Sequence, residues 1–328
     1  MSSVEHFKRA KIISVGTSVP DTVLNNSDFE KMVDTTDEWI VTRTGIRSRH
    51  IAARDSGVTT AGLGSVAAQT ALERANIAPD QVDGIICATI TPDGLFPSTA
   101  CKIQAELGCR RAFAFDISAA CAGFLYGLSL AQNFILSGKG STCLVIGSEI
   151  LSRITDYKDR ATCILFGDGA GAAVVQGTND GDAGTSGAGI LSVCLGSDGS
   201  LGKILKCNLW EESHFMYMEG REVFKQAVRM MSEIARKAVA EAGLTFGDID
   251  YLIPHQANIR IIRSLGETLK IAPEKVVVNL ENFGNTSSAS IPLALNEATR
   301  DGRIKKGSTV LFTSLGGGVT VAGAVVRF

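Results

Sequence analysis

Short apolar runs alternate with longer apolar or amphipathic stretches along the chain, and glycines separate them. Runs such as IICATI (85–90) and CLVIG (143–147) have the length of buried strands. Residues 111–118 predict another strand, and residues 119–138 predict a long helix that is apolar on nearly every face. A helix of this kind lies at the centre of a protein. The alternation predicts an α/β fold.

Parts of the pattern recur at one constant offset. A helix end, a turn and the entry to a strand surround both Asp83 and Asp250, which lie 167 positions apart. The tetrapeptide KGST precedes an apolar run at 139–142 and again at 306–309, at the same offset of 167. A constant offset at two separated points indicates a duplicated structural unit.

The duplication predicts two halves of similar size. We place the first at residues 1–182 and the second at 183–328. The stretch 177–189 is rich in Gly, Asp, Thr and Ser, as is typical of a linker.

Composition narrows the class of protein. The 328 residues are 45% hydrophobic and 20% charged, as in ordinary globular chains. No uncharged apolar run reaches the roughly 18 residues of a membrane span, and the N-terminus lacks a signal-peptide core, so we expect a cytoplasmic protein. A net charge of −2 argues against nucleic acid as a partner. The eight cysteines show no zinc-type CxxC spacing, so we expect no metal site and a buried structural role for seven of them.

Cys121 stands where the predicted strand passes into the buried helix. Free N–H groups and the helix dipole favour an anion there, so we expect a lowered thiol pKa and a nucleophilic thiolate. The neighbouring residues are alanines and a glycine, which leave room for a thioester. The alternative is a buried structural thiol.

The second half carries polar groups at the matching places. At the offset of 167, Cys121 corresponds to Ser288 in GNTSSAS, and Ala88 corresponds to His255 at the end of DYLIPH. Asn285 belongs to the same turn as Ser288. Alone, such a histidine is more often structural and such an asparagine is more often a turn former. Together they predict a constellation that faces Cys121.

Several runs resemble, in order along the whole chain, the β-ketoacyl-[acyl carrier protein] synthase III family, which starts bacterial type II fatty-acid synthesis. The resemblance implies a thiolase-like α/β fold with two duplicated halves, each with a mixed β-sheet, layered α-β-α-β-α around a buried central helix pair. The runs are DEWIVTRTGI (37–46), DISAACAGF (116–124), FGDGAGAAVV (166–175), PHQANIRII (254–262), GNTSSAS (284–290) and GGGVTVAGAVVRF (316–328).

The resemblance also implies the reaction. An acyl-CoA would acylate Cys121, and malonyl-[acyl carrier protein] would decarboxylate and condense with that acyl group, assisted by His255 and Asn285. The backbone N–H groups of Cys121 and Gly317 would form an oxyanion hole, in which each donor is worth about 3 kcal/mol. No cofactor is implied, because the coenzyme A thioester is a substrate. Elongating relatives use a second histidine where this chain has Asn285, which favours the initiating class.

Binding residues follow from the same resemblance. It assigns coenzyme A contacts to Trp39, Arg43, Arg160 and Asn258, with Trp39 stacked on the adenine and the arginines against its ring or phosphates. The alternative for Trp39 is a partly buried surface aromatic.

The resemblance further implies two protein partners. Lys225, Arg260 and Arg263 would form a basic patch for the acidic carrier protein, although solvated helix faces are the alternative. Phe96 would reach across a homodimer interface to close the acyl pocket, or would simply pack in the core.

Other features leave alternatives open. Val319 and Val321 replace aromatic residues of the family, so the primer length and branching stay open. The glycine-rich run 167–171 lacks the Lys-Ser/Thr of a nucleotide loop and is expected to serve close packing. The alternative functions are a specialised condensing enzyme of secondary metabolism with the same three residues, a Cys–His hydrolase and a non-catalytic subunit of the same fold.

Overall fold

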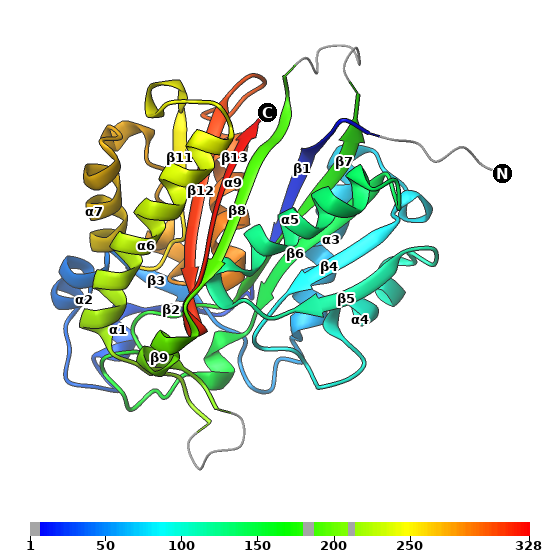
Figure 1. Ribbon diagram of the computed structural model, residues 1–328. Helices are drawn as coiled ribbons and strands as arrows, with labels where there is room; N and C mark the ends of the chain where they lie inside the picture. Colours follow the sequence, from blue (N-terminus) through cyan, green and yellow to red (C-terminus); the bar gives the residue numbers. More distant parts are fainter. Residues whose placement is uncertain (1–6, 180–186, 209–213) are drawn as a thin grey trace.

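The structure is a computed structural model that describes residues 7–179, 187–208 and 214–328 (Figure 1). Its first sheet is built from the strands β1 (Arg9–Ser18), β4 (Gly84–Ala88), β5 (Phe113–Ile117), β6 (Thr142–Glu149) and β7 (Gly169–Thr178). Their order is β1-β7-β6-β4-β5. β4 runs parallel to β5 and β6, whereas β7 is antiparallel to β6 and β1, so the sheet is mixed.

The second sheet repeats most of this plan. It is built from β8 (Gly189–Ser197), β11 (Tyr251–Pro254), β12 (Thr309–Gly316) and β13 (Thr320–Arg327). Their order is β11-β12-β13-β8, with only β11 and β12 parallel. Two small antiparallel sheets pair β2 (Val23–Asn25) with β3 (Ser48–His50) and β9 (Leu205–Lys206) with β10 (Tyr217–Met218).

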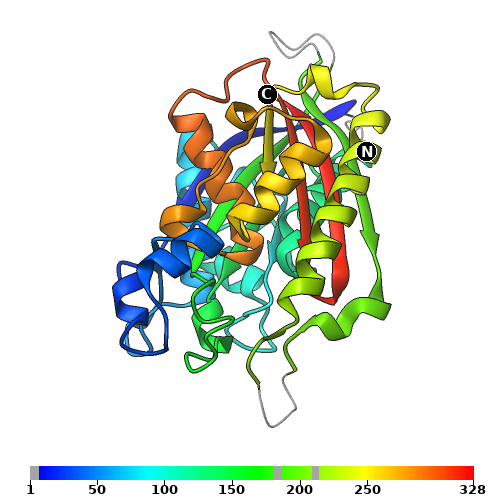
Figure 2. The ribbon, with the colours of Figure 1, turned by 90° about the vertical axis from the view of Figure 1, so that its left-hand side faces the viewer.

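Helices complete five layers (Figures 1 and 2). The central layer holds α5 (Gly123–Leu136) and α9 (Ser290–Arg300), whose apolar side chains share one core with both sheets. α3 (Thr60–Ala75) and α4 (Thr99–Leu107) cover the first sheet, and α6 (Gly220–Glu241) and α7 (Ile259–Leu269) cover the second. The predicted thiolase-like layering is confirmed. The remaining α-helices of the described residues are α1 (Asn26–Phe29), α2 (Asp37–Thr44) and α8 (Leu280–Phe283).

The predicted repeat is visible in the element bounds and in the hydrogen bonds. β6 and β12 begin and end at residues 167 positions apart. Asp83 Oδ2 accepts a hydrogen bond from the Thr142 amide at 3.1 Å, and Asp250 Oδ2 accepts one from the Thr309 amide at 2.8 Å. The two aspartates therefore tie the start of the matching strand in each half. The boundary between 182 and 183 lies outside the described residues, so the division into two domains stays a prediction.

Two predicted bounds need correction. The central helix begins at Gly123 rather than at 119, because Ala120 has φ 46° and a short 3₁₀ turn over Ala120–Ala122 precedes the helix. The predicted linker 177–189 is too long, because β7 continues to Thr178 and β8 begins at Gly189.

The glycine-rich run 167–171, which leads into β7, serves close packing, as predicted. A Cβ on Gly167 would overlap the carbonyl oxygen of Phe283, and one on Gly171 would lie 2.7 Å from the ring of Pro292. Asp168 between them is buried and accepts a hydrogen bond from Ser152 Oγ at 2.6 Å.

All eight cysteines are free. Five are buried, but Cys101, Cys121 and Cys207 are only partly buried, so the expectation of seven buried structural thiols is wrong. Cys207 lies against the main cavity described below. In the described part of the chain, His, Cys, Asp and Glu side chains form no cluster suited to a metal ion. The helices of that part are all too short or too polar to cross a membrane.

Candidate active site

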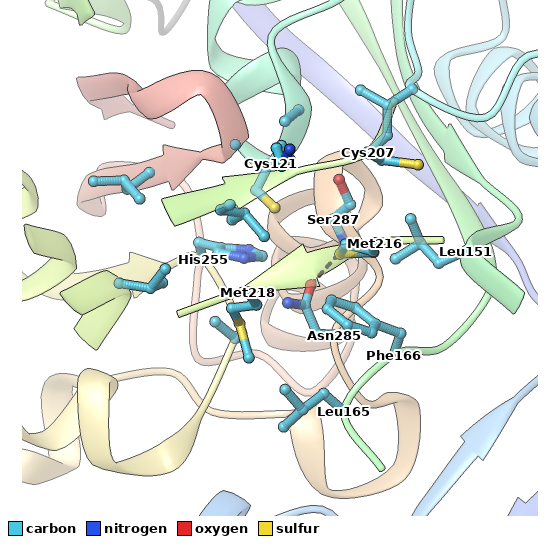
Figure 3. Close-up of a pocket in the computed structure, with 18 of the residues that line it drawn as sticks. Cys121, Leu151, Leu165, Phe166, Cys207, Met216, Met218, His255, Asn285 and Ser287 are labelled. Atoms are coloured by element: carbon cyan, nitrogen blue, oxygen red, sulfur yellow. Dashed lines mark hydrogen bonds between the residues drawn. The ribbon is translucent and has the colours of Figure 1, made fainter. Parts of the chain in front are cut away.

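Cys121, His255 and Asn285 meet at one cavity of about 1380 Å³ (Figure 3). Cys121 comes from the turn before α5, and His255 follows the last residue of β11. Asn285 precedes the 3₁₀ turn Ser287–Ala289, which leads into α9. The cavity thus joins the thiol of the first half to polar groups of the second, as the offset predicted.

Strands of the second sheet hold the Cys121 turn. Ser314 Oγ donates a hydrogen bond to the Cys121 carbonyl at 2.7 Å, and Thr320 Oγ1 donates to the Ala119 carbonyl at 2.7 Å. Gly316 packs so closely that a Cβ there would lie 2.8 Å from the Cys121 amide nitrogen. The position of the thiol therefore depends on the half of the chain that does not contain it.

The pKa of the Cys121 thiol differs from the expectation. Burial raises this pKa to about 12, an effect that the nearby Ser287 hydroxyl only partly offsets. The residue is only partly buried because it lines the cavity. The predicted lowering is wrong, because desolvation outweighs the helix end, and α5 itself begins only at Gly123. The resting thiol is protonated and needs a base.

His255 is a neutral imidazole. Only 4% of the residue is exposed, and burial lowers the pKa of the ring to about 3. Its Nδ1 lies 2.7 Å from Ser290 Oγ, at the first residue of α9. A hydroxyl both donates and accepts, so Ser290 can pair with either tautomer of the ring. His255 Nε2 is therefore able to accept a proton or to donate one.

Asn285 is fixed through its oxygen. Its Oδ1 accepts a hydrogen bond from the Ser287 amide at 2.9 Å, drawn as a dashed line in Figure 3. Its backbone amide donates to the Leu165 carbonyl at 2.8 Å, and the Gly167 amide donates to the Asn285 carbonyl at 3.0 Å. With Oδ1 occupied, Nδ2 is the atom left to donate toward the cavity. Gly317, the predicted oxyanion donor, also lines the cavity.

The predicted coenzyme A residues lie close together, and Trp39, Arg43 and Asn258 line the cavity. Trp39 lies on α2, with the Arg160 guanidinium 4.2 Å and the Arg43 guanidinium 5.2 Å from its ring centre. Asn258 caps α7, because its Oδ1 accepts from the Arg260 amide at 2.8 Å, and its Nδ2 donates to the Arg43 carbonyl at 3.1 Å. The side chain of Asn258 thus has a structural task that the sequence analysis did not assign.

The predicted basic patch lies on α6 and α7. Lys225, Arg260 and Arg263 are exposed. Lys225 is 3.8 Å from Glu222, and the Arg260 guanidinium lies 5.6 Å from the ring centre of Phe224. Of the three, Arg260 lines the cavity.

Phe96 is not a core residue. Its exposed fraction is 87%, and that of the adjacent Leu95 is 73%, so the core-packing alternative is wrong. Leu95 also lines the cavity, which connects this apolar surface to the candidate site. Val319 and Val321, by contrast, are buried among α6 side chains and do not line the cavity.

The sequence analysis missed several residues at or near the cavity. Ser290 orients His255, Arg221 lines the cavity beside Arg260, and Ser287 lies beside Cys121. Of these, only Ser287 could have been predicted from the sequence. It lies at the offset of 167 from Ala120, the neighbour of Cys121. Glu149, a buried carboxyl behind this group, lies at the end of an apolar run that reads simply as a strand.

Known proteins are similar to this chain in sequence and in fold. Two family models, 3-Oxoacyl-[acyl-carrier-protein (ACP)] synthase III and its C-terminal part, match residues 115–199 and 239–328. The chain is 48% identical to the beta-ketoacyl-[acyl-carrier-protein] synthase III of Aquifex aeolicus (strain VF5), over 97% of this chain and 99% of that protein.

Solved structures agree. The beta-ketoacyl-[acyl carrier protein] synthase III of Thermus thermophilus has a TM-score of 0.91 at 45% identity, covering 97% of this chain and 99% of that one. The priming beta-ketosynthase of the R1128 polyketide pathway also has a TM-score of 0.91, but at 36% identity, covering 98% and 97%.

The fold and the cavity define an acyltransferase with a thiolase-like architecture. The chain belongs to the 3-oxoacyl-[acyl-carrier-protein] synthase III family. Its higher identity to proteins of that name than to the polyketide enzyme favours the initiating condensing enzyme of fatty-acid synthesis over the specialised alternative.

Proposed function

We propose that the protein transfers an acyl group from an acyl-CoA to Cys121 and condenses it with malonyl-[acyl carrier protein]. The observation that carries this proposal is the meeting of a thiol, a neutral imidazole and an amide donor at one cavity. The primer is acetyl-CoA or another short acyl-CoA. The steps need no redox or metal cofactor, because the coenzyme A thioester is itself the substrate.

In the first step Cys121 Sγ bonds to the acyl carbon and the bond to coenzyme A breaks. His255 Nε2 takes the thiol proton and passes it to the departing coenzyme A sulfur, with Nδ1–H donating to Ser290 Oγ. A base is required because the pKa of the resting thiol is about 12. The amides of Cys121 and Gly317 bind the developing oxyanion.

In the second step malonyl-[acyl carrier protein] loses CO2 and leaves an enolate on its thioester oxygen. Between the two steps the imidazole exchanges protons with water in the cavity, so that Nδ1 loses its proton and Nε2 gains one. His255 Nε2–H and Asn285 Nδ2 then donate hydrogen bonds to that oxygen, and Ser290 donates to Nδ1. The enolate carbon bonds to the acyl carbon, the bond to Cys121 breaks, and the thiolate takes up a proton from solvent, so that each turnover consumes one proton. The products are 3-oxoacyl-[acyl carrier protein], CO2 and free enzyme.

Trp39, Arg43 and Arg160 bind coenzyme A at the cavity mouth. The position of both guanidinium groups over the Trp39 ring supports this role, since adenine can take the place of the Arg160 guanidinium on that ring if Arg160 moves outward. Asn258 contacts the pantetheine arm only if its capping hydrogen bonds are rearranged.

The carrier protein binds over α6 and α7. Lys225, Arg260 and Arg263 supply positive charge there, and Arg260 adjoins the cavity. We place the protein in the cytoplasm, which eight free cysteines support.

The functional unit is a homodimer. The exposed Phe96 and Leu95 support this, because burial against a second copy would remove both from water and place Phe96 near the cavity of the partner. Substituting Phe96→Asp is expected to give monomers in light scattering, whereas Val23→Asp, at another exposed apolar residue, leaves the mass unchanged. A monomeric wild-type protein would contradict the proposal.

Intact-protein mass spectrometry tests the reaction. We expect an acyl adduct on Cys121 after incubation with an acyl-CoA, and its loss as 3-oxoacyl-[acyl carrier protein] forms. An adduct that only hydrolyses would favour the hydrolase alternative. The absence of any adduct across a panel of primers would refute the role of Cys121.

A further inference from the structure

Glu149 is a buried carboxyl that the proposed reaction does not use. It ends β6 and has an exposed fraction of 0%. Its Oε2 accepts hydrogen bonds from the Ile90 amide at 3.1 Å and from Thr91 Oγ1 at 2.7 Å. The described residues supply only neutral donors to it, so none of these hydrogen bonds brings a positive charge to an ionised carboxylate.

A count of protons indicates that Glu149 is a neutral acid. Ser288 Oγ lies 2.9 Å from Glu149 Oε1 and 2.9 Å from the Ala88 carbonyl oxygen. The hydroxyl has one proton and the carbonyl only accepts, so with an ionised Glu149 one of these contacts would join two acceptors. A proton on Oε1 satisfies both contacts. Burial acts in the same direction and raises the pKa of Glu149.

Ser287 lies between this carboxyl and the thiol. It lines the cavity with an exposed fraction of 2%, and Figure 3 shows it beside Cys121. Its Oγ has no hydrogen-bond partner of normal geometry, yet it is near enough to lower the pKa of both Cys121 and Glu149. Its backbone has φ 50° and is fixed by Asn285 Oδ1. A buried, unpaired hydroxyl held in an unfavourable conformation is a costly feature to keep without a use.

We propose that Ser287 is a further catalytic residue, whose hydroxyl donates a hydrogen bond to the Cys121 sulfur whenever that sulfur is anionic. Glu149 is a positioning residue that holds the Ser287–Ser288 turn as a neutral acid. The inference rests on the proposed role of Cys121. That sulfur is anionic when it loses its proton before acylation, and again when it leaves the acyl carbon in the condensation. The Ser287 proton stays on its oxygen throughout, so no net proton transfer passes through it.

Other charged groups near this turn are few. Among the described residues, His255 faces the cavity beside Cys121, and burial, together with the carboxylates of Asp116 and Asp93, raises the pKa of the Cys87 thiol. The variants below leave these groups unchanged, so a pH dependence that differs from wild type reports the effect of the substituted residue.

Two variants remove the hydroxyl in different ways. Ser287→Ala keeps the strained backbone, whereas Ser287→Gly removes the strain as well, because glycine adopts positive φ freely. We expect both to slow acylation of Cys121 by acetyl-CoA about 10- to 100-fold. We also expect both to shift the pH midpoint of Cys121 alkylation by iodoacetamide upward. The matched control is Thr286→Val, which removes a buried, unpaired hydroxyl one residue away that does not line the cavity.

Glu149→Gln tests the neutral acid. An amide can donate to Ser288 Oγ as the protonated acid does, so we expect the alkylation midpoint of Cys121 to stay within about 0.3 pH units of wild type. A clear fall of the midpoint would mean that a negative charge had been removed and would overturn this assignment.

The outcomes separate the two proposals. If wild-type protein forms no adduct on Cys121, the proposed function fails. If wild type forms the adduct and both Ser287 variants match its acylation rate and alkylation midpoint, the function stands and the role of Ser287 is wrong. A slow Ser287→Ala with a normal Ser287→Gly would assign the loss to backbone strain and would equally overturn that role.

Discussion

The turn at Cys121 and the turn at Ser288 have similar backbone conformations but carry side chains of different chemistry. Each is a short 3₁₀ turn before a central helix, and the residues that open them, Ala120 and Ser287, have φ 46° and 50°. Each packs against the strand end of the other half. Gly316 meets the Cys121 turn, and at the same offset of 167 Glu149 meets Ser288.

The difference shows how a duplicated unit divides its tasks. At Gly316 the missing side chain lets the strand approach the Cys121 amide. At Glu149 a carboxyl fills the corresponding space and bonds the Ser288 turn. The second turn thereby becomes a rigid support that carries Asn285 and Ser287 toward the thiol.

The largest expected effect comes from removing the thiol. Cys121→Ala should lower condensation by at least about 10⁴-fold, because no other side chain of the turn can carry the acyl group. Steady-state turnover with malonyl-[acyl carrier protein] and an acyl-CoA measures this loss. Residual turnover above one hundredth of wild type would contradict the account.

His255 corresponds to Ala88 in the first half, so His255→Ala makes the two strand ends alike. We expect acylation and condensation each to slow about 10²- to 10³-fold, because the imidazole serves both steps. Rapid-quench mass spectrometry measures the steps separately. Unchanged acylation in this variant would exclude His255 as the base of the first step.

Gly316→Ala tests whether the Cys121 turn needs the close approach of the strand end at Gly316. The added Cβ would lie 2.6 Å from the Ala119 carbonyl oxygen and 2.8 Å from the Cys121 amide, so the turn must move. A shift of about 1 Å in a catalytic group is expected to lower kcat about 100-fold. Gly199→Ala is the matched control, since a Cβ there meets nothing within 4 Å. Equal activity of both variants would show that the close approach of Gly316 is not needed.

A smaller effect concerns pH and stability. The pKa of His255 is about 3 in the folded protein and about 6.5 in the unfolded chain, so the unfolded state binds more protons between these values. The free energy of unfolding should therefore fall as the pH drops below about 6.5, by roughly 2 kcal/mol between pH 7 and 5. Urea unfolding at both pH values measures this loss. His255→Gln should have a smaller pH dependence, and an identical slope would contradict the shifted pKa.

Much of the fold followed from local patterns in the sequence. The apolar helix after Cys121 predicted a central helix, and the repeats around Asp83 and Asp250 predicted matching strands, because these signals depend on neighbours in the chain. The same offset indicated that His255 and Asn285 face the thiol, and the structure confirms this arrangement.

Features that depend on distant contacts escaped prediction. The pKa of Cys121 is set by burial in the folded protein, so the local helix-end argument gave the wrong sign. Glu149 meets Ser288 139 positions away, and its strand reads as purely structural. The exposure of Phe96 depends on how distant elements pack around its loop. A local sequence pattern does not indicate this packing.

The division of tasks between the halves is the central claim, and Asn285→Ala tests it most directly. Acyl-CoA is added to this variant, malonyl-[acyl carrier protein] follows, and the mass of the intact protein is recorded over time. The account predicts that the adduct on Cys121 still forms, slowed no more than in the Ser287 variants because Asn285 Oδ1 also fixes Ser287, and that it then persists, because the enolate alone requires the Nδ2 donor of Asn285. An adduct that is consumed as fast as in wild type, or that fails to form, would contradict it.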